Sequence, residues 1–308
     1  MAEAARINPR TIFTESEWAR LNARSTWIGP VLVLNCWAVI LAAGVMAVVW
    51  PLTLPLAVMV IGGRQLGLAI LMHDAAHRAL HPDPAINDFL GKWLCDPSLD
   101  LYRPYHLNHH RFAQQSEDPD LALSAPFPIS RASLRRKIIR DLTGQTYFKQ
   151  RFGALSMYNL DSARPSRTAS IWAVIKSRRR TLLGGVICTA ALAPFGLWWA
   201  WLALWFLPSA TWLPLVTRLR NIGEHACIAQ NEPDPMCQAR TTLANMVERA
   251  LIAPYWVNYH CEHHMFMYLP CYRLVQAHRM LREKGLLERM EVRAGYAEML
   301  RLAAPAGA

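Results

Sequence analysis

Nine of the eleven histidines fall in four short motifs whose spacing suits metal coordination. Three motifs are boxes that read HDAAH, HLNHH and HCEHH, and a looser NIGEH motif lies between the last two. On a helix, residues three or four apart share a face, so each motif can direct its imidazoles to one point. The motifs contain His73, His77, His106, His109, His110, Asn221, His225, His260, His263 and His264.

Neutral imidazole is a good ligand for iron, zinc, copper and nickel. One ion takes only about four to six ligands, so nine imidazoles indicate two metal ions. A single HxxxH is often just two histidines on a helix surface, but three boxes and an NxxxH argue against that interpretation. The sequence lacks HExxH, the usual zinc-protease motif, so it does not predict a zinc protease. Histidine ligands alone do not distinguish iron from zinc or copper.

The composition is that of a membrane protein. Of 308 residues, 53% are hydrophobic and only 18% charged, and twelve tryptophans and twenty prolines suit interfacial anchors and helix ends. Seven cysteines without a CxxC pair argue against disulfides and zinc ribbons, so we interpret them as reduced thiols.

The N-terminal residues 1–26 are expected to form a cytoplasmic amphipathic segment. Acidic residues and the lack of an early apolar core exclude a signal peptide. Thr14 and Glu17 have the spacing of a capping box, which predicts the start of a short helix. Trp18 and Leu21 on this helix would face either a membrane surface or the rest of the protein.

Apolar runs predict an all-α integral membrane protein with four transmembrane helices, since a span needs about 20 apolar residues. The predicted spans are residues 27–50, 52–72, 181–195 and 197–217, arranged as two hairpins that turn near Pro51 and Pro194. Neither turn is charged, whereas arginines 178–180, Arg218 and Arg220 flank the second hairpin. The positive-inside rule then places both termini and all four motifs in the cytoplasm. We expect the motifs to meet in a helical cap just below the membrane face.

Arg64 and Gln65 interrupt the second predicted span. An ionisable residue at that depth is either functional or satisfied by neighbouring backbone. Gly63 and Gly67 form a GxxxG, which predicts close helix packing. Glu117, Asp118 and Asp120 follow the second box and would either orient ligand histidines or form a solvated turn. His278 is expected at the surface.

Residues 131–180 are strongly basic, with 13 Lys and Arg against 2 acids, which matches the net charge of +11 for the whole chain. Nucleic acid would suit such charge, but the position between membrane segments favours anionic lipid or an acidic protein partner. We expect arginines 178–180 to contact lipid, and Arg135, Arg136 and Lys137 to contact a redox partner.

The order HxxxH, HxxHH, NxxxH and HxxHH, with four spans in two hairpins, resembles the membrane fatty acid desaturase and hydroxylase family over roughly residues 25–285. The NxxxH of Asn221 and His225 resembles the acyl-chain desaturase branch. The resemblance implies a desaturase-like domain at residues 27–285, a cytoplasmic helix and tail at 286–308, and a multi-pass location in the bacterial inner membrane. It also implies two iron ions, with the nine box histidines as ligands and Asn221 binding through water. Some members have four residues inside the first box, so His81 is an alternative ligand there.

The same resemblance implies an oxygen-dependent enzyme that removes hydrogen from an unactivated C–H bond of a fatty acyl lipid. Dioxygen is the co-substrate. No redox domain is visible, so the electrons would come from a separate ferredoxin- or cytochrome-type donor docking on residues 131–180. A hydroxylase or ketolase acting on a fatty acyl, carotenoid or alkane substrate shares this chemistry. A membrane metal carrier and a zinc hydrolase are two further alternatives, the first disfavoured because no histidine lies inside an apolar run.

Overall fold

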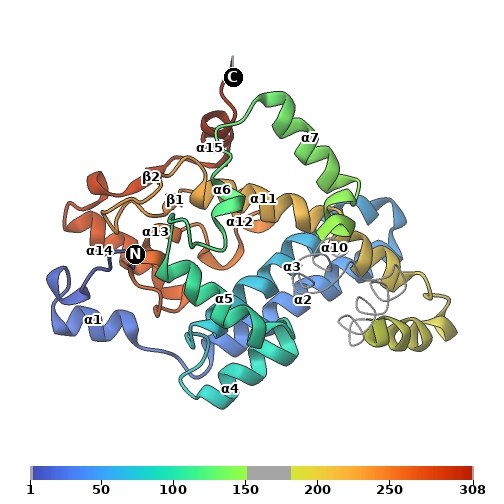
Figure 1. Cartoon of the computed structure of the whole chain (residues 1–308). Helices are drawn as coiled ribbons and strands as arrows, with labels where there is room; N and C mark the ends of the chain where they lie inside the picture. The colour runs from blue at the N-terminus through green and yellow to red at the C-terminus, as the bar shows by residue number, and fades with distance from the viewer. Residues whose placement is uncertain (1–2, 151–181, 307–308) are drawn as a thin grey trace, which may run out of the picture. The chain divides into compact units, whose positions relative to one another are not determined.

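A computed structural model describes residues 3–150 and 182–306 (Figure 1). Most of the basic 131–180 segment, including the arginines expected at lipid, lies outside these residues. Helices dominate, as the sequence predicts: α1 (Glu15–Asn22), α2 (Ile28–Val49), α3 (Leu54–Ala76), α4 (Pro84–Phe89), α5 (Leu99–Arg111), α6 (Leu121–Ser124), α7 (Arg131–Leu142), α10 (Leu207–Ala210), α11 (Trp212–His225), α12 (Met246–Leu251), α13 (His260–Met265), α14 (Cys271–Glu283) and α15 (Tyr296–Ala303).

Two short strands depart from the all-α prediction. β1 (Arg240–Thr242) pairs in parallel with β2 (Glu291–Arg293), and Thr241 lies opposite Val292. Three residues per strand are too few to show an alternating pattern of polar and apolar residues, so the sequence carried no strand signal here.

Three helices in the described residues are long and apolar enough to cross a membrane: Ile28–Val49, Pro51–Ala76 and Leu202–His225. The second extends past the predicted end at residue 72 and carries His73, and the third carries the whole NxxxH motif. Leu182–Phe195 is also an apolar helix but is shorter. It ends at a turn where Gly196 adopts a left-handed backbone with φ +74°, close to the predicted break at Pro194.

The chain divides into two units. The first comprises Met1–Ile40, Gly63–Leu134 and Val216–Ala308, and the second comprises Leu41–Gly62 and Arg135–Leu215. All four histidine motifs belong to the first unit. In the second unit, Trp212 packs on Gly62, where an added Cβ would lie 2.8 Å from the Cβ of the tryptophan.

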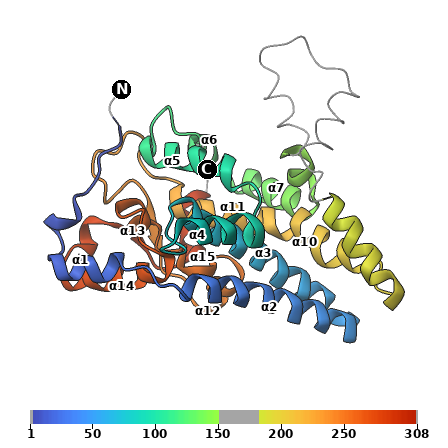
Figure 2. The ribbon, with the colours of Figure 1, turned by 90° about the horizontal axis from the view of Figure 1, so that it is seen from below.

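Helix α1 begins at the capping box that the sequence predicts, with Thr14 accepting from the amide of Glu17. The helix lies beside α14 in both views (Figures 1 and 2). Leu21 is fully buried, and the Trp18 ring lies 5.6 Å from that of Phe266. The apolar face of α1 is therefore covered by protein.

The GxxxG of α3 makes a close approach, as predicted. A Cβ at Gly67 would lie 2.9 Å from the Tyr255 ring, and one at Gly63 would lie 3.1 Å from the Leu251 carbonyl oxygen. Between them, Arg64 Nη2 donates to the carbonyl of Ala250 at 2.6 Å. Its guanidinium also lies 5.6 Å from the centroid of the Tyr255 ring. Of the two interpretations of Arg64, the contacts support satisfaction by neighbouring backbone.

Candidate metal centre

Helix ends carry the four motifs into the interior of the first unit. The first box lies at the C-terminal end of α3, the second in the last turns of α5, and the third forms most of α13. His225 is the last residue of α11. All nine box histidines are buried except His264, which is partly buried. The helical spacing of each motif points its imidazoles inward, as the sequence predicts.

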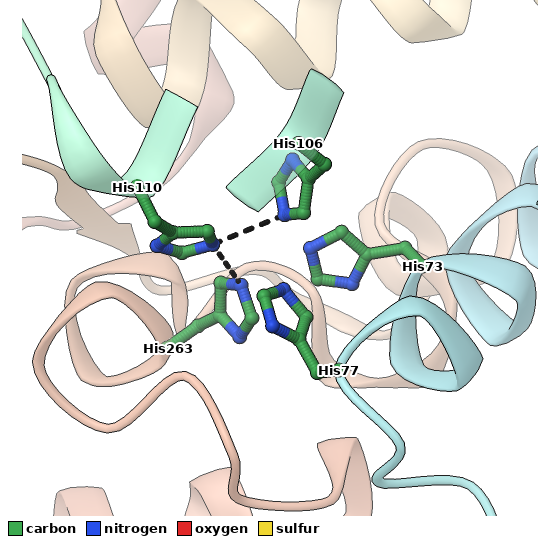
Figure 3. A group of neighbouring side chains, drawn as sticks. All are labelled: His73, His77, His106, His110 and His263. Atoms are coloured by element: carbon green, nitrogen blue, oxygen red, sulfur yellow. Dashed lines mark hydrogen bonds between the residues drawn. The ribbon is translucent and has the colours of Figure 1, made fainter. Parts of the chain in front are cut away.

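Five imidazoles form a first cluster, in which one ligand nitrogen from each lies within 4.8 Å of the others. His110 Nε2 is 3.0 Å from both His106 Nε2 and His263 Nε2. Figure 3 shows these three rings facing His73 and His77, which come from α3 and the turn after it. The first cluster therefore joins the first, second and third boxes.

Four imidazoles form a second cluster with the same spread of 4.8 Å. His260 Nε2 lies 2.9 Å from His225 Nε2 and 3.2 Å from His264 Nε2, which in turn lies 3.3 Å from His109 Nε2. The second cluster joins the NxxxH motif to the second and third boxes. Together the two clusters account for all nine box histidines.

These nitrogen contacts suit a shared cation better than mutual hydrogen bonds. A neutral imidazole has one N–H and one acceptor nitrogen, so several converging nitrogens cannot all be satisfied by one another. Two ligands about 2.1 Å from one ion lie about 3 Å apart when the angle between them is near 90°. The observed separations of 2.9 to 3.3 Å match that spacing.

Burial also keeps the imidazoles in the form that binds metal. It lowers the pKa of His77 to about 3. It also lowers the pKa of five box histidines on α5 and α13 well below the ordinary value, namely His106, His110, His260, His263 and His264. These rings are therefore neutral at pH 7, and each keeps a lone pair for a cation.

His73 and His77 supply a direct test of whether a metal fits. Both nitrogens of both rings are buried and have no hydrogen-bond partner in the part of the chain that the structure describes. A buried polar atom without a partner costs about 1–3 kcal/mol. A cation in the first cluster would satisfy one nitrogen of each ring, so the donor set fits a bound metal.

Asp118 fixes the orientation of His109. Its Oδ1 lies 2.8 Å from His109 Nδ1, and its Oδ2 accepts from the Gln114 amide at 3.0 Å. A carboxylate that accepts the Nδ1 proton leaves the Nε2 lone pair free for a metal. Of the predicted carboxylates, Asp118 has the orienting role, while Glu117 is exposed beside Ser116.

The prediction that His278 lies at the surface is wrong. His278 is buried, and its Nδ1 lies 2.5 Å from Glu262 Oε1, inside the third box. The other carboxylate oxygen accepts from the Thr241 hydroxyl. The signal was present, because Leu274 and Leu281 lie four residues before and three after His278, on the same face of α14.

His81 is not a member of either cluster. His81 Nδ1 accepts from the Asp83 amide at 3.0 Å, and the ring belongs to neither group of converging nitrogens. Asn221 is half-buried, one helical turn before His225 on α11. Sequence reasoning passed over Glu224, a buried carboxylate inside the NxxxH motif.

Comparisons with known proteins agree with this site. A family model described as fatty acid desaturase matches residues 49–294, a range that contains all four motifs. A dihydrorhizobitoxine desaturase from Bradyrhizobium elkanii is 25% identical over 264 residues, which cover 82% of this chain and 75% of that protein.

Proposed function

Since this chain belongs to the fatty acid desaturase family, we propose that it is an oxygen-dependent di-iron enzyme that desaturates a lipid acyl chain. The family makes it a desaturase-like oxidoreductase, and the two histidine clusters suit a metal cofactor. One observation supports the specific proposal above the others: nine histidines from four separate segments converge into two buried groups within the family match.

The chain's own residues hold and insulate the centre. The five imidazoles of the first cluster and the four of the second would each bind one iron, with Asn221 acting on the second through water. Two irons bound there would supply dioxygen activation with two electrons from a donor. Asp118 holds His109 in the tautomer that binds metal. Burial of the rings excludes water from the donor atoms.

The position of the clusters supports a substrate with an apolar tail. His73 and His225 lie at the ends of helices long and apolar enough to span a membrane. A substrate lying in the lipid could therefore reach the site at the membrane face. The name of the relative gives dihydrorhizobitoxine as its substrate, so membership of the family leaves the substrate of this chain to experiment. Both names specify desaturation, which favours it over hydroxylation.

The apolar helices and the family indicate a membrane protein. We further propose four spans in two hairpins, with Leu182–Phe195 as the third, in the bacterial inner membrane. Both termini and the metal site would be cytoplasmic. Cysteines introduced at residues 10 and 301 should react with membrane-permeant reagents only, because both positions are exposed and would lie inside. A periplasmic residue 301 would contradict this topology.

Lipid mass spectrometry tests the activity. Cells that express the protein with a suitable electron donor should gain acyl chains two mass units lighter than those of cells expressing His109→Ala. Chains sixteen units heavier would instead identify a hydroxylase. An unchanged lipid profile, with iron fully bound and the donor active, would exclude lipid acyl desaturation.

A further inference from the structure

The second cluster depends on how the end of helix α11 is held. His225, the last residue of that helix, is the ring that α11 supplies, and the other three rings come from α5 and α13. Carbonyl groups in the last turn of a helix have no partner within the helix, and helix ends fray. The first cluster takes its rings from α3, the turn after it, α5 and α13. Contacts at the end of α11 therefore bear on the second cluster.

Strand β1 supplies hydrogen-bond donors to the end of α11. Thr242 Oγ1 donates to the carbonyl of Gly223 at 2.9 Å, two residues before His225. Arg240 Nη1 donates to the carbonyl of Ala226 at 2.8 Å, one residue after His225. Both donating residues are only 1% exposed. Residues two apart in a strand point to the same side, so one face of β1 holds the chain on both sides of His225.

The backbone of β1 and its opposite face hold helix α13. The Thr241 hydroxyl donates to Glu262 Oε2, and Glu262 lies two residues after His260. The Thr242 amide donates to the carbonyl of Asn258 at 3.0 Å. The side chain of Asn258 donates in return, from Nδ2 to the carbonyl of Thr242, at 3.0 Å. Asn258 lies two residues before His260, so β1 also contacts the chain on both sides of that ring.

Strand β2 and helix α15 support this arrangement. The two strands pair in parallel over three residues, and the Leu243 amide donates to the carbonyl of Arg293 at 2.8 Å. Tyr296, the first residue of α15, packs on Gly223, where an added Cβ would lie 2.6 Å from its ring. The chain from residue 291 to residue 296 therefore backs both β1 and the last turn of α11.

We propose that β1 sets the distance between His225 and His260, with Thr242 and Arg240 as positioning residues of the second metal site. The inference rests on the proposed metal function. The Nε2 atoms of the two rings lie 2.9 Å apart, although their helices are far apart in the chain. Ligand groups have to be held within about 0.5 Å of their productive geometry, and this strand contacts both helices within three residues. The rings are therefore placed for a shared ion before the ion binds.

Metal titration of the full-length protein tests this role. Apo-protein in detergent is titrated anaerobically with ⁵⁷Fe(II), and Mössbauer spectra are recorded at one and two equivalents. Thr242→Val keeps the shape of the side chain but removes the hydroxyl. It should bind one iron normally and the other at least about tenfold more weakly, as is typical when a group that orients a metal ligand is lost. The spectrum of the weakened iron should change, and that of the other should not.

Two matched variants separate positioning from general stability. Thr242→Ser keeps the hydroxyl and should restore the affinity and spectrum of the second iron. Thr11→Val is the control, because the Thr11 hydroxyl also donates to a backbone carbonyl, that of Asn8, but at an exposed position. Thermal unfolding of each apo-protein is recorded beside the titration. Thr11→Val should bind both irons as the wild type does.

Arg240→Lys repeats the test from the other side of His225 if Thr242→Val does not fold. It keeps the charge but not the reach to the carbonyl of Ala226. Wild-type affinities and spectra for both irons in the two variants overturn the proposal. Equal weakening of both irons, or failure of both variants to fold, also overturns it, because β1 would then maintain the fold and not one site. A wild-type protein that binds no second iron defeats the proposed function itself.

Discussion

His278 Nδ1 and Glu262 Oε1 lie 2.5 Å apart inside the protein, and this contact ties α14 to the third histidine box. Glu262 is fully buried. On α13 it lies between His260 of the second cluster and His263 of the first cluster along the chain. The side chain that holds its carboxylate therefore controls how α13 presents His260, His263 and His264.

His278→Ala should destabilise the protein and reduce its metal content. The substitution leaves a buried carboxylate with one hydrogen-bond partner fewer, and the loss of such a partner costs about 1–3 kcal/mol. Thermal unfolding and metal analysis of purified protein measure both effects. Arg279→Ala, at an exposed position on the same helix, should leave both unchanged. A His278→Ala protein with wild-type stability and iron would show that the contact has no structural role.

Asp118→Asn should weaken metal binding without removing a ligand. The amide can present its NH₂ group to His109 Nδ1, which favours the wrong tautomer, and losses of 10–100-fold in affinity are typical for such partners. Competition with a chelator measures the affinity. Glu117→Gln, one residue earlier and exposed, is the control. Equal affinities in the two variants would refute the orienting role.

Replacing single imidazoles should separate ligands from bystanders. His109→Ala, His225→Ala and His263→Ala should each abolish activity and lower the iron content, because each removes a ring from a cluster. His81→Ala should retain both irons, since His81 lies outside the two clusters. Loss of iron in His81→Ala, at unchanged helix content, would instead identify His81 as a metal ligand.

Acid should destabilise the apo-protein. Burial holds the pKa of His77 at about 3, against about 6.5 in the unfolded chain. It also lowers the pKa of His106, His110, His260, His263 and His264. Between these values the unfolded chain binds more protons, so the free energy of unfolding falls as pH falls from about 6.5 towards 3. Denaturant unfolding from pH 8 to pH 5 measures the slope. Stability that rises towards pH 5 would contradict neutral buried rings.

Charge reversal on α7 tests the prediction that a separate electron donor docks on this helix. Arg135 and Arg136 are exposed, and Lys137 follows them. Replacing all three with Glu should lower turnover at limiting donor and weaken its salt dependence, since opposite charges steer association. Turnover should recover at saturating donor with iron unchanged. Unaltered donor kinetics, together with poor membrane insertion, would assign these residues to lipid instead.

The histidines of the two clusters were predictable from the sequence, whereas their surroundings were only partly so. Each box places its rings on one helical face, and that local periodicity survives in the fold. Asp118 was predictable because it follows its histidine closely along the chain. The contact of Glu262 with His278 depends on how α14 packs on α13, and spacing within one motif does not encode it.

The apolar runs in the sequence predicted the long helices, but they did not predict where those helices end. α3 continues through His73 because Asp74, Ala75 and Ala76 remain compatible with a helix after the apolar run has stopped. The pairing of β1 with β2 joins residues about fifty positions apart, so no local sequence pattern predicts it.

Because each cluster draws donors from segments far apart in the chain, a bound ion would act as a crosslink across the first unit. A ligand that binds only the folded state, at a concentration 1,000 times its Kd, stabilises that state by about 4.1 kcal/mol. Metal supply would then govern the lifetime of the protein as well as its turnover. Cells starved of the metal would lose the protein to proteolysis, and its abundance would report their metal status.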